Sequence, residues 1–140
     1  LQKMVKKSDI NTYTVDSNQI ERVKGYMREL LNDNPICELD EGIHRSVLTQ
    51  FAKNHLNIEA IWSNYSDGTF IFSNPPAGIV NARVRPWFRN AMEGKFYVSE
   101  IYVSAVTKRK CLTISCPIKD GNSIVGVLGV DLSITDTEIN

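Results

Sequence analysis

The chain has 140 residues, the length of one domain, and 42% of them are apolar, which is enough for a single hydrophobic core. Its 16 basic and 16 acidic side chains cancel, so it lacks the positive excess that nucleic-acid binding requires. No apolar run approaches the roughly 20 residues of a membrane span, and no signal peptide opens the chain. The chain is therefore expected to be a soluble protein, or a domain taken from a longer protein without its flanking spans.

Neither a metal site nor a disulfide framework is indicated. Cys37, Cys111 and Cys116 are an odd number of cysteines without metal-ligand spacing. Cys111 and Cys116 are five residues apart on one predicted strand, so they face opposite sides and are not expected to pair. Neither His44 nor His55 has a second histidine or cysteine four residues away, which favours surface or capping roles. We expect free thiols and no cofactor.

The first part of the chain, up to about residue 56, is predicted to be helical. Residues 16–33 carry apolar side chains at helical spacing, and Pro35 follows the end of the pattern. A second helix is predicted over residues 41–54, with Asp40 near its start. The segment before residue 16 is compatible with an extension of the first helix, although Thr and Val residues weaken that pattern.

From residue 58 the pattern changes to the two-residue period of a strand. A strand from residue 58 and a second over 69–73 flank a Ser-Asp-Gly turn, which is typical of a hairpin. A proline-rich break precedes a short helix around 87–93 that ends at Gly94. Three further strands are predicted, over 96–103, 110–118 and 123–131. The sequence therefore predicts one α+β domain, residues 1–140, with N-terminal helices and a five-stranded antiparallel sheet over about 57–133.

Residues 83–88, RVRPWF, are the main candidate for binding chemistry. A guanidinium beside flat apolar walls suits a small carboxylate held away from bulk water. Arg83 and Arg85 stand in an extended segment, and at most one of them is expected to face a pocket. Pro86 is expected to begin the short helix, which places Trp87 in its first turn beside free backbone amides. An equally open interpretation is structural, with Arg85 in a cap or salt bridge and Trp87 in the core.

These residues are part of a longer ordered set of motifs. Downstream of residues 83–88 lie Ala91, Gly94, Tyr102, LTISCPI at 112–118 and GVLGVDL at 126–132. Over about residues 58–133 the set resembles the Cache family of extracytoplasmic sensor domains. The resemblance implies a PAS-like sheet with a small-molecule pocket, between two membrane spans of a bacterial chemoreceptor, histidine kinase or cyclic-nucleotide signalling enzyme. The chain closes soon after the last motif, as expected of the family's single-module form.

The resemblance also implies a ligand site. Arg85 and Trp87 match the positions that grip a ligand carboxylate, and Asp131 matches the second acidic residue that receives a ligand amine. Phe88 stands where amino-acid-binding members usually have a tyrosine, and Val80 occupies another tyrosine position. From its place in the strand alone, Asp131 could equally cap a turn or pair with an arginine.

The family's Tyr-x-Asp pair is also changed here, to Tyr102-Val103-Ser104. Tyr102 and Ser104 share one face of their predicted strand, and they can donate hydrogen bonds to a ligand if Arg85 faces that side. Tyr65 and Trp62, on the hairpin, are weaker candidates for the pocket walls, because an aromatic residue in a strand is more often core.

These departures decide the expected ligand. Burying an ammonium with fewer partners is unfavourable by several kcal/mol, which favours a small carboxylate without an amine, such as pyruvate, lactate, acetate or propionate. The alternatives are an amino-acid or amine sensor of the same fold, and a ligand-free module that forms a homodimer through the helix over 16–33. No nucleophile with a base and no glycine-rich phosphate loop is present, so an enzyme is not expected.

Overall fold

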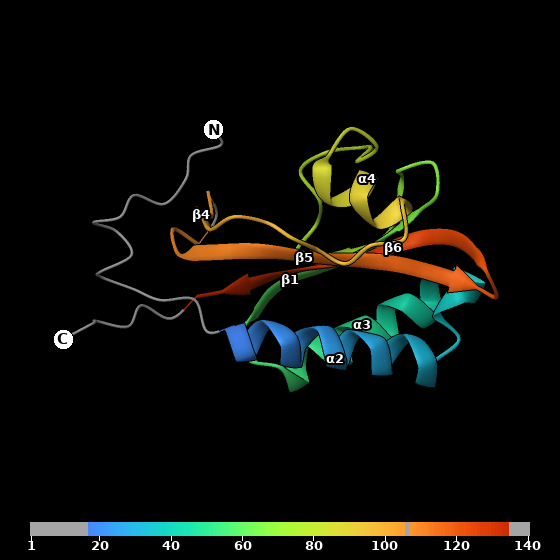
Figure 1. Ribbon diagram of the computed structural model, residues 1–140, viewed down its shortest axis with the longest axis horizontal. Helices are drawn as coiled ribbons and strands as arrows, with labels where there is room; N and C mark the ends of the chain where they lie inside the picture. Colours follow the sequence, from blue (N-terminus) through green and yellow to red (C-terminus); the bar gives the residue numbers. More distant parts are fainter. Residues whose placement is uncertain (1–16, 106, 135–140) are drawn as a thin grey trace.

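This computed structural model describes residues 17–105 and 107–134. An antiparallel sheet lies between two unequal layers: helices α2 and α3 cover one face, and the short helix α4 lies over part of the other (Figure 1). The predicted extension before residue 16 lies outside the described residues. No helix within them is long and apolar enough to cross a bilayer.

The helical layer closely follows the sequence prediction. Helix α2 spans Ser17–Asp33, a 3-10 turn spans Ile36–Glu38, and α3 spans Glu41–Asn54. The carboxylate of Asp40 accepts a hydrogen bond of 2.9 Å from the amide of Ile43, which makes Asp40 the N-cap of α3. Both predicted helices are confirmed where the structure describes them.

The sheet contains six strands in five positions, in the order β2-β1-β6-β5-β3, with β4 also paired to β5. The bounds are β1 Ile58–Tyr65, β2 Phe70–Asn74, β3 Tyr97–Val98, β4 Tyr102–Val103, β5 Lys110–Asp120 and β6 Ser123–Ser133. The predicted α+β fold is confirmed. Its fourth and fifth strands correspond to β5 and β6, whereas the strand expected over 96–103 is divided into β3 and β4.

Ser99 explains this division. The Thr113 amide donates a 2.8 Å hydrogen bond to the Ser99 side-chain oxygen, and the Ser99 amide donates to the Thr113 carbonyl at 2.9 Å. The Thr113 amide is therefore bonded to the Ser99 hydroxyl and not to a backbone carbonyl, as it would be in a regular antiparallel pair. Regular pairing with β5 stops there and resumes at Tyr102. Both short strands remain along the same edge of β5.

The two faces of the sheet are packed differently. The helix face carries the main core, built from α2, α3 and alternate strand residues, among them Met27, Leu30, Leu48, Ile61, Ile114, Leu128 and Val130. On the other face, α4 (Pro86–Met92) covers a small core of Ala82, Phe88, Ala91 and Val127. Pro86 begins α4 and Gly94 follows it with φ 93°, as predicted. The uncovered remainder of this face is where a cavity forms.

His44 corrects a prediction. It is fully buried, neither at the surface nor a cap, and its ring nitrogens lie 2.7 Å from Ser63 Oγ and 2.8 Å from the Ile36 carbonyl oxygen. A carbonyl only accepts, so Nε2 carries the proton and Nδ1 accepts from Ser63. His55 is the C-cap residue of α3 and stacks on Tyr26 with ring centroids 4.4 Å apart.

Candidate ligand-binding site

A cavity of about 420 Å³ opens on the α4 face of the sheet. Its lining comes from β1, β2, the 75–79 segment, the start of α4, and β4 to β6. Its polar side chains include Arg85, Tyr102, Thr113 and Asp131. Its volume lies within the range of small-molecule sites.

Asp131 lies within β6, not at the end of a strand as the sequence suggested. Its carboxylate accepts a hydrogen bond of 2.8 Å from the hydroxyl of Thr113, its neighbour on β5. Since the single hydroxyl proton of Thr113 is used there, Tyr102 donates its own to Thr113 Oγ1 across 3.1 Å. Two hydroxyl groups in series therefore point toward one carboxylate.

Burial shifts the pKa values of Asp131 and Tyr102, the two ends of this series of hydrogen bonds. Desolvation is the largest influence on the carboxyl of Asp131 and raises its pKa, although the hydrogen bond from Thr113 acts in the opposite direction. Desolvation likewise raises the pKa of Tyr102, so the phenol stays protonated. The Asp131 carboxylate makes no ion pair with any described residue, so a cation at this position would stabilise its ionised form.

Arg85 supplies the opposite charge. It is the N-cap residue of α4, with an exposed side chain that lines the cavity, and it too makes no ion pair with a described residue.

Arg83, two residues earlier, is exposed near Asp67 and does not line the cavity. The backbone between the two arginines is not extended, because the Arg85 amide donates a 2.8 Å hydrogen bond to the Ala82 carbonyl and closes a turn. In a regular strand, residues two positions apart would share a face. The turn therefore separates the two guanidinium groups, and only Arg85 lies at the cavity.

Two tryptophans form adjoining walls. Trp62 of β1 and Trp87 of α4 meet edge to face with ring centroids 5.1 Å apart. Trp87 is held by its carbonyl, which accepts a 2.8 Å hydrogen bond from Ser115 of β5. The indole of Trp62 lies across β6 at Gly129, where any Cβ atom would overlap the ring. Gly129, the second glycine of the GVLGVDL run, thus leaves room for the Trp62 wall.

The structure brings five of the eight predicted site residues around this cavity: Arg85, Trp87, Tyr102, Asp131 and Trp62. Sequence reasoning missed Thr113, whose role depends on pairing with residues far along the chain. A signal for it was available in the sequence. Thr113 and Ser115 are two residues apart in a mostly apolar strand, so their hydroxyl groups face the same side of the sheet.

The other three predicted residues lie outside the lining. Ser104 follows β4 in a turn, where its hydroxyl oxygen accepts from the Thr107 amide at 3.2 Å. Phe88 is 4% exposed in the small core, because it falls on the sheet side of α4. Tyr65 is 39% exposed at the end of β1, beside the hairpin turn.

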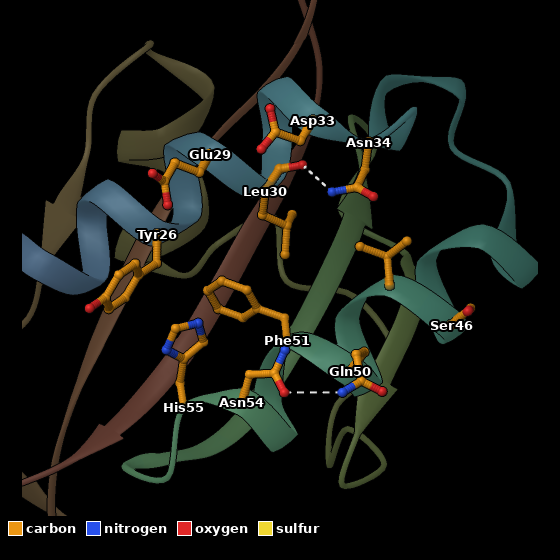
Figure 2. Close-up of a pocket in the computed structure, with 11 residues that line it drawn as sticks. Tyr26, Glu29, Leu30, Asp33, Asn34, Ser46, Gln50, Phe51, Asn54 and His55 are labelled. Carbon is orange, nitrogen blue, oxygen red and sulfur yellow. Dashed lines mark hydrogen bonds between the residues drawn. The ribbon is translucent and has the colours of Figure 1, made fainter.

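A second hollow, of about 600 Å³, lies between α2 and α3 (Figure 2). Figure 2 shows Leu30 and Phe51 between the two helices, with Glu29 and Asp33 on α2. Its lining includes two carboxylates and no arginine or lysine, so it has no cation for an acidic ligand. Among the described residues, no cluster of His, Cys, Asp or Glu is suited to hold a metal ion.

A PAS-like sheet with an aromatic and charged cavity on its open face is an arrangement typical of sensor domains that bind small molecules. Residues 58–138 match the family model described as the methyl-accepting chemotaxis protein-like, first PDC sensor domain. The chain belongs to this family. It is accordingly a sensor domain and not an enzyme.

Curated relatives include chemotaxis receptors. The chain is 33% identical to the methyl-accepting chemotaxis protein TlpA of Bacillus subtilis over 92 residues, 62% of this chain and 13% of that protein. It is 31% identical to a probable methyl-accepting chemotaxis protein of Bacillus thuringiensis subsp. konkukian over 127 residues, 87% of this chain and 18% of that protein. A shorter match, 41% over 54 residues, covers 37% of this chain and 9% of a citrate (Re)-synthase of Syntrophus aciditrophicus. The chain spans less than a fifth of each.

Solved structures share the fold. The ligand-binding domain of Mlp24 with asparagine is 25% identical, with a TM-score of 0.66 over 84% of this chain and 50% of that chain. The ligand-binding domain of Campylobacter jejuni chemoreceptor Tlp3 in complex with L-norvaline has the same TM-score at 19% identity, over 84% of this chain and 52% of that chain. The Tlp3 likeness concerns the fold alone, and it agrees with the predicted PAS-like architecture.

Proposed function

We propose that this chain is the ligand-sensing domain of a bacterial membrane receptor, on the extracytoplasmic side, and that its cavity binds a small amino acid. One observation carries the proposal: Arg85 and Asp131 line the same cavity, and neither has an ionic partner among the described residues. Separate positive and negative walls complement a zwitterion, with its carboxylate at Arg85 and its ammonium at Asp131.

This proposal changes the preference drawn from the sequence, which was a carboxylate without an amine. That preference depended on the loss of partners for an ammonium. Thr113 holds the Asp131 carboxylate in place by a hydrogen bond, and Tyr102 donates in turn to Thr113, which keeps the carboxylate oriented toward a ligand ammonium. A ligand with a carboxylate alone would leave Asp131 without a cation and add a second negative charge to the cavity. Mlp24, a relative at 25% identity, has asparagine in its solved structure.

A small monocarboxylate such as pyruvate, lactate, acetate or propionate remains the second candidate. The observation in its favour is the raised pKa of Asp131, because a protonated Asp131 would carry no charge against the ligand. The two candidates therefore differ in what they require of this side chain: an amino acid needs it ionised, and a monocarboxylate needs it neutral.

The test is a thermal-shift and calorimetric screen of the chain against amino acids, monocarboxylates and dicarboxylates. A ligand at about 100 times its Kd adds roughly 2.7 kcal/mol to the stability of the domain. Amino acids should stabilise the wild type, and Arg85→Ala should abolish the effect, whereas Arg83→Ala is the matched control that should retain it.

Asp131→Asn separates the candidates. It should remove the response to amino acids, whereas a monocarboxylate would bind the variant at least as well as the wild type. A folded chain with no response to any compound would contradict both candidates and favour the ligand-free module that forms a homodimer.

A further inference from the structure

The hollow between α2 and α3 lies on the opposite face of the sheet from the cavity beside α4 (Figure 1). Residues of α2 form one wall, and their spacing of three and four positions places them on one face of that helix: Tyr26, Glu29, Leu30 and Asp33. The facing wall is α3, whose lining side chains are all neutral, among them Val47, Gln50 and Phe51. Both carboxylates of the hollow therefore come from α2.

Negative charge is concentrated at the C-terminal end of α2. Glu29 and Asp33 are four residues apart, about 6 Å along the helix axis, where two like charges repel each other. Asp33 is the last residue of α2, whose last turn contains no basic residue, so its carboxylate adds to the negative end of the helix dipole. Neither carboxylate makes an ion pair with a described residue. A cation bound in the hollow would relieve this repulsion.

The only lining side chain that could itself become a cation is His55. Desolvation lowers its pKa, although the charge of Glu29 acts in the opposite direction, so the ring is neutral at pH 7. The hollow therefore supplies no positive charge of its own to balance its two carboxylates.

The base and one end of the hollow are apolar and aromatic. Leu30 and Phe51 are buried between the two helices. Tyr26 and His55 stack with ring centroids 4.4 Å apart, and the Phe51 ring lies 4.5 Å from that of His55. Figure 2 shows these rings at one end of the hollow and Asp33 at the other. Alkyl chains gain affinity from such a surface, and ammonium groups are attracted to ring faces, whereas an inorganic ion would leave this surface unused.

We propose that this hollow is a second ligand site, which binds a linear aliphatic diamine such as putrescine or cadaverine. The two ammonium groups match the two carboxylates of α2, and the methylene chain between them lies along Leu30 and Phe51. The volume of about 600 Å³ is within the range of small-molecule sites. The inference is independent of the proposed function, because the two sets of lining residues have no member in common.

Isothermal titration calorimetry with putrescine tests the site. Pentylamine is the matched probe, because it has the same length and carries a methyl group in place of one ammonium. The Kd for putrescine should be at least about threefold lower than that for pentylamine, and it should rise with salt concentration. Pentylamine binding as tightly as putrescine, or calcium chloride binding as tightly as either, would overturn the diamine assignment. If putrescine does not bind, the second site fails and the amino-acid proposal is unaffected.

Substitutions place the effect at the hollow. Glu29→Gln and Asp33→Asn should each weaken putrescine binding about three- to fivefold, and the double variant about tenfold or more. Both remove negative charge from the end of α2, so the variants without ligand should be at least as stable in urea as the wild type. Glu38→Gln is the matched control, because Glu38 is an exposed carboxylate outside the lining, and it should change the Kd by less than about twofold. An equal loss in Glu38→Gln, or a loss in Asp131→Asn in place of the two α2 variants, would overturn the assignment.

Discussion

The hydroxyl of Thr113 donates a 2.8 Å hydrogen bond to the carboxylate of Asp131, its pairing partner on the adjacent strand. The backbone of Thr113 also holds Ser99 on the β3 side, and its side-chain oxygen accepts from Tyr102 on β4. One residue therefore ties the edge segment of the sheet to the carboxylate in the cavity.

Thr113→Val tests this role, since valine keeps the shape and removes the hydroxyl. Loss of a hydrogen bond to a charged group should lower stability by about 1.5–3 kcal/mol. It should also raise the pKa of Asp131 further, because the Thr113 bond is one of the interactions that lower it, and so weaken amino-acid binding at neutral pH. Urea denaturation and titration calorimetry measure the two effects. Thr113→Ser, which keeps the hydroxyl, should resemble the wild type; equal losses in both variants would contradict the role.

The stability contribution of Asp131 should depend on pH. Its pKa is raised in the folded state, so its favourable contribution is complete below the unfolded value of about 3.9 and is lost as pH rises through the folded pKa. Asp131→Asn, which does not titrate, should therefore gain stability relative to the wild type between pH 4 and pH 7. Urea denaturation across that range gives the difference, and a difference that is constant with pH would show that burial does not perturb this carboxyl.

Ligand binding should show the complementary dependence. An ammonium binds the ionised form of Asp131, so the affinity for an amino acid should fall as pH is lowered through the raised pKa. Titration calorimetry in two buffers of different ionisation enthalpy measures the linked proton release. A monocarboxylate should show the opposite trend, with tighter binding at the lower pH.

Gly129→Ala should disturb the tryptophan wall that Trp62 forms in the cavity. Its Cβ would overlap the Trp62 indole, so the ring must shift, at a cost of about 1–3 kcal/mol. Ligand binding should weaken, and tryptophan fluorescence should change. Gly25→Ala in α2 is the control, because no atom lies within 4 Å of its added Cβ and it should raise helix stability by up to about 1 kcal/mol. Unchanged fluorescence and stability in Gly129→Ala would disprove this packing.

Buried His44 should make the fold sensitive to mild acid. Desolvation lowers its pKa in the folded state, so its stabilisation is present above the unfolded value of about 6.5 and is lost as pH falls through the folded pKa. His44→Gln, measured in a His55→Gln background so that no other histidine titrates, should flatten the stability profile between pH 7 and about pH 5. An unchanged profile would assign the acid sensitivity to other groups.

Much of the local structure follows from short-range patterns. Helical periodicity and the Asp40 cap set the bounds of α3. The fixed φ of Pro86 sets the start of α4, and the positive φ of Gly94 sets the turn after it. Each of these signals involves residues only a few positions apart. The position of Arg85 at the N-cap of α4 is local in the same sense, because the proline that begins the helix is the next residue.

What only the tertiary structure decided depends on contacts between distant residues. Strand register places Thr113 beside Asp131, 18 positions away, and Ser99 beside Thr113, where its hydroxyl divides the expected strand in two. Packing of α3 on β1 turns His44 from an expected surface residue into a buried one. The sequence determined the fold class, the helices and the arginine of the cavity because those signals are local; the partners of Asp131 were decided by sheet pairing, which local periodicity does not specify.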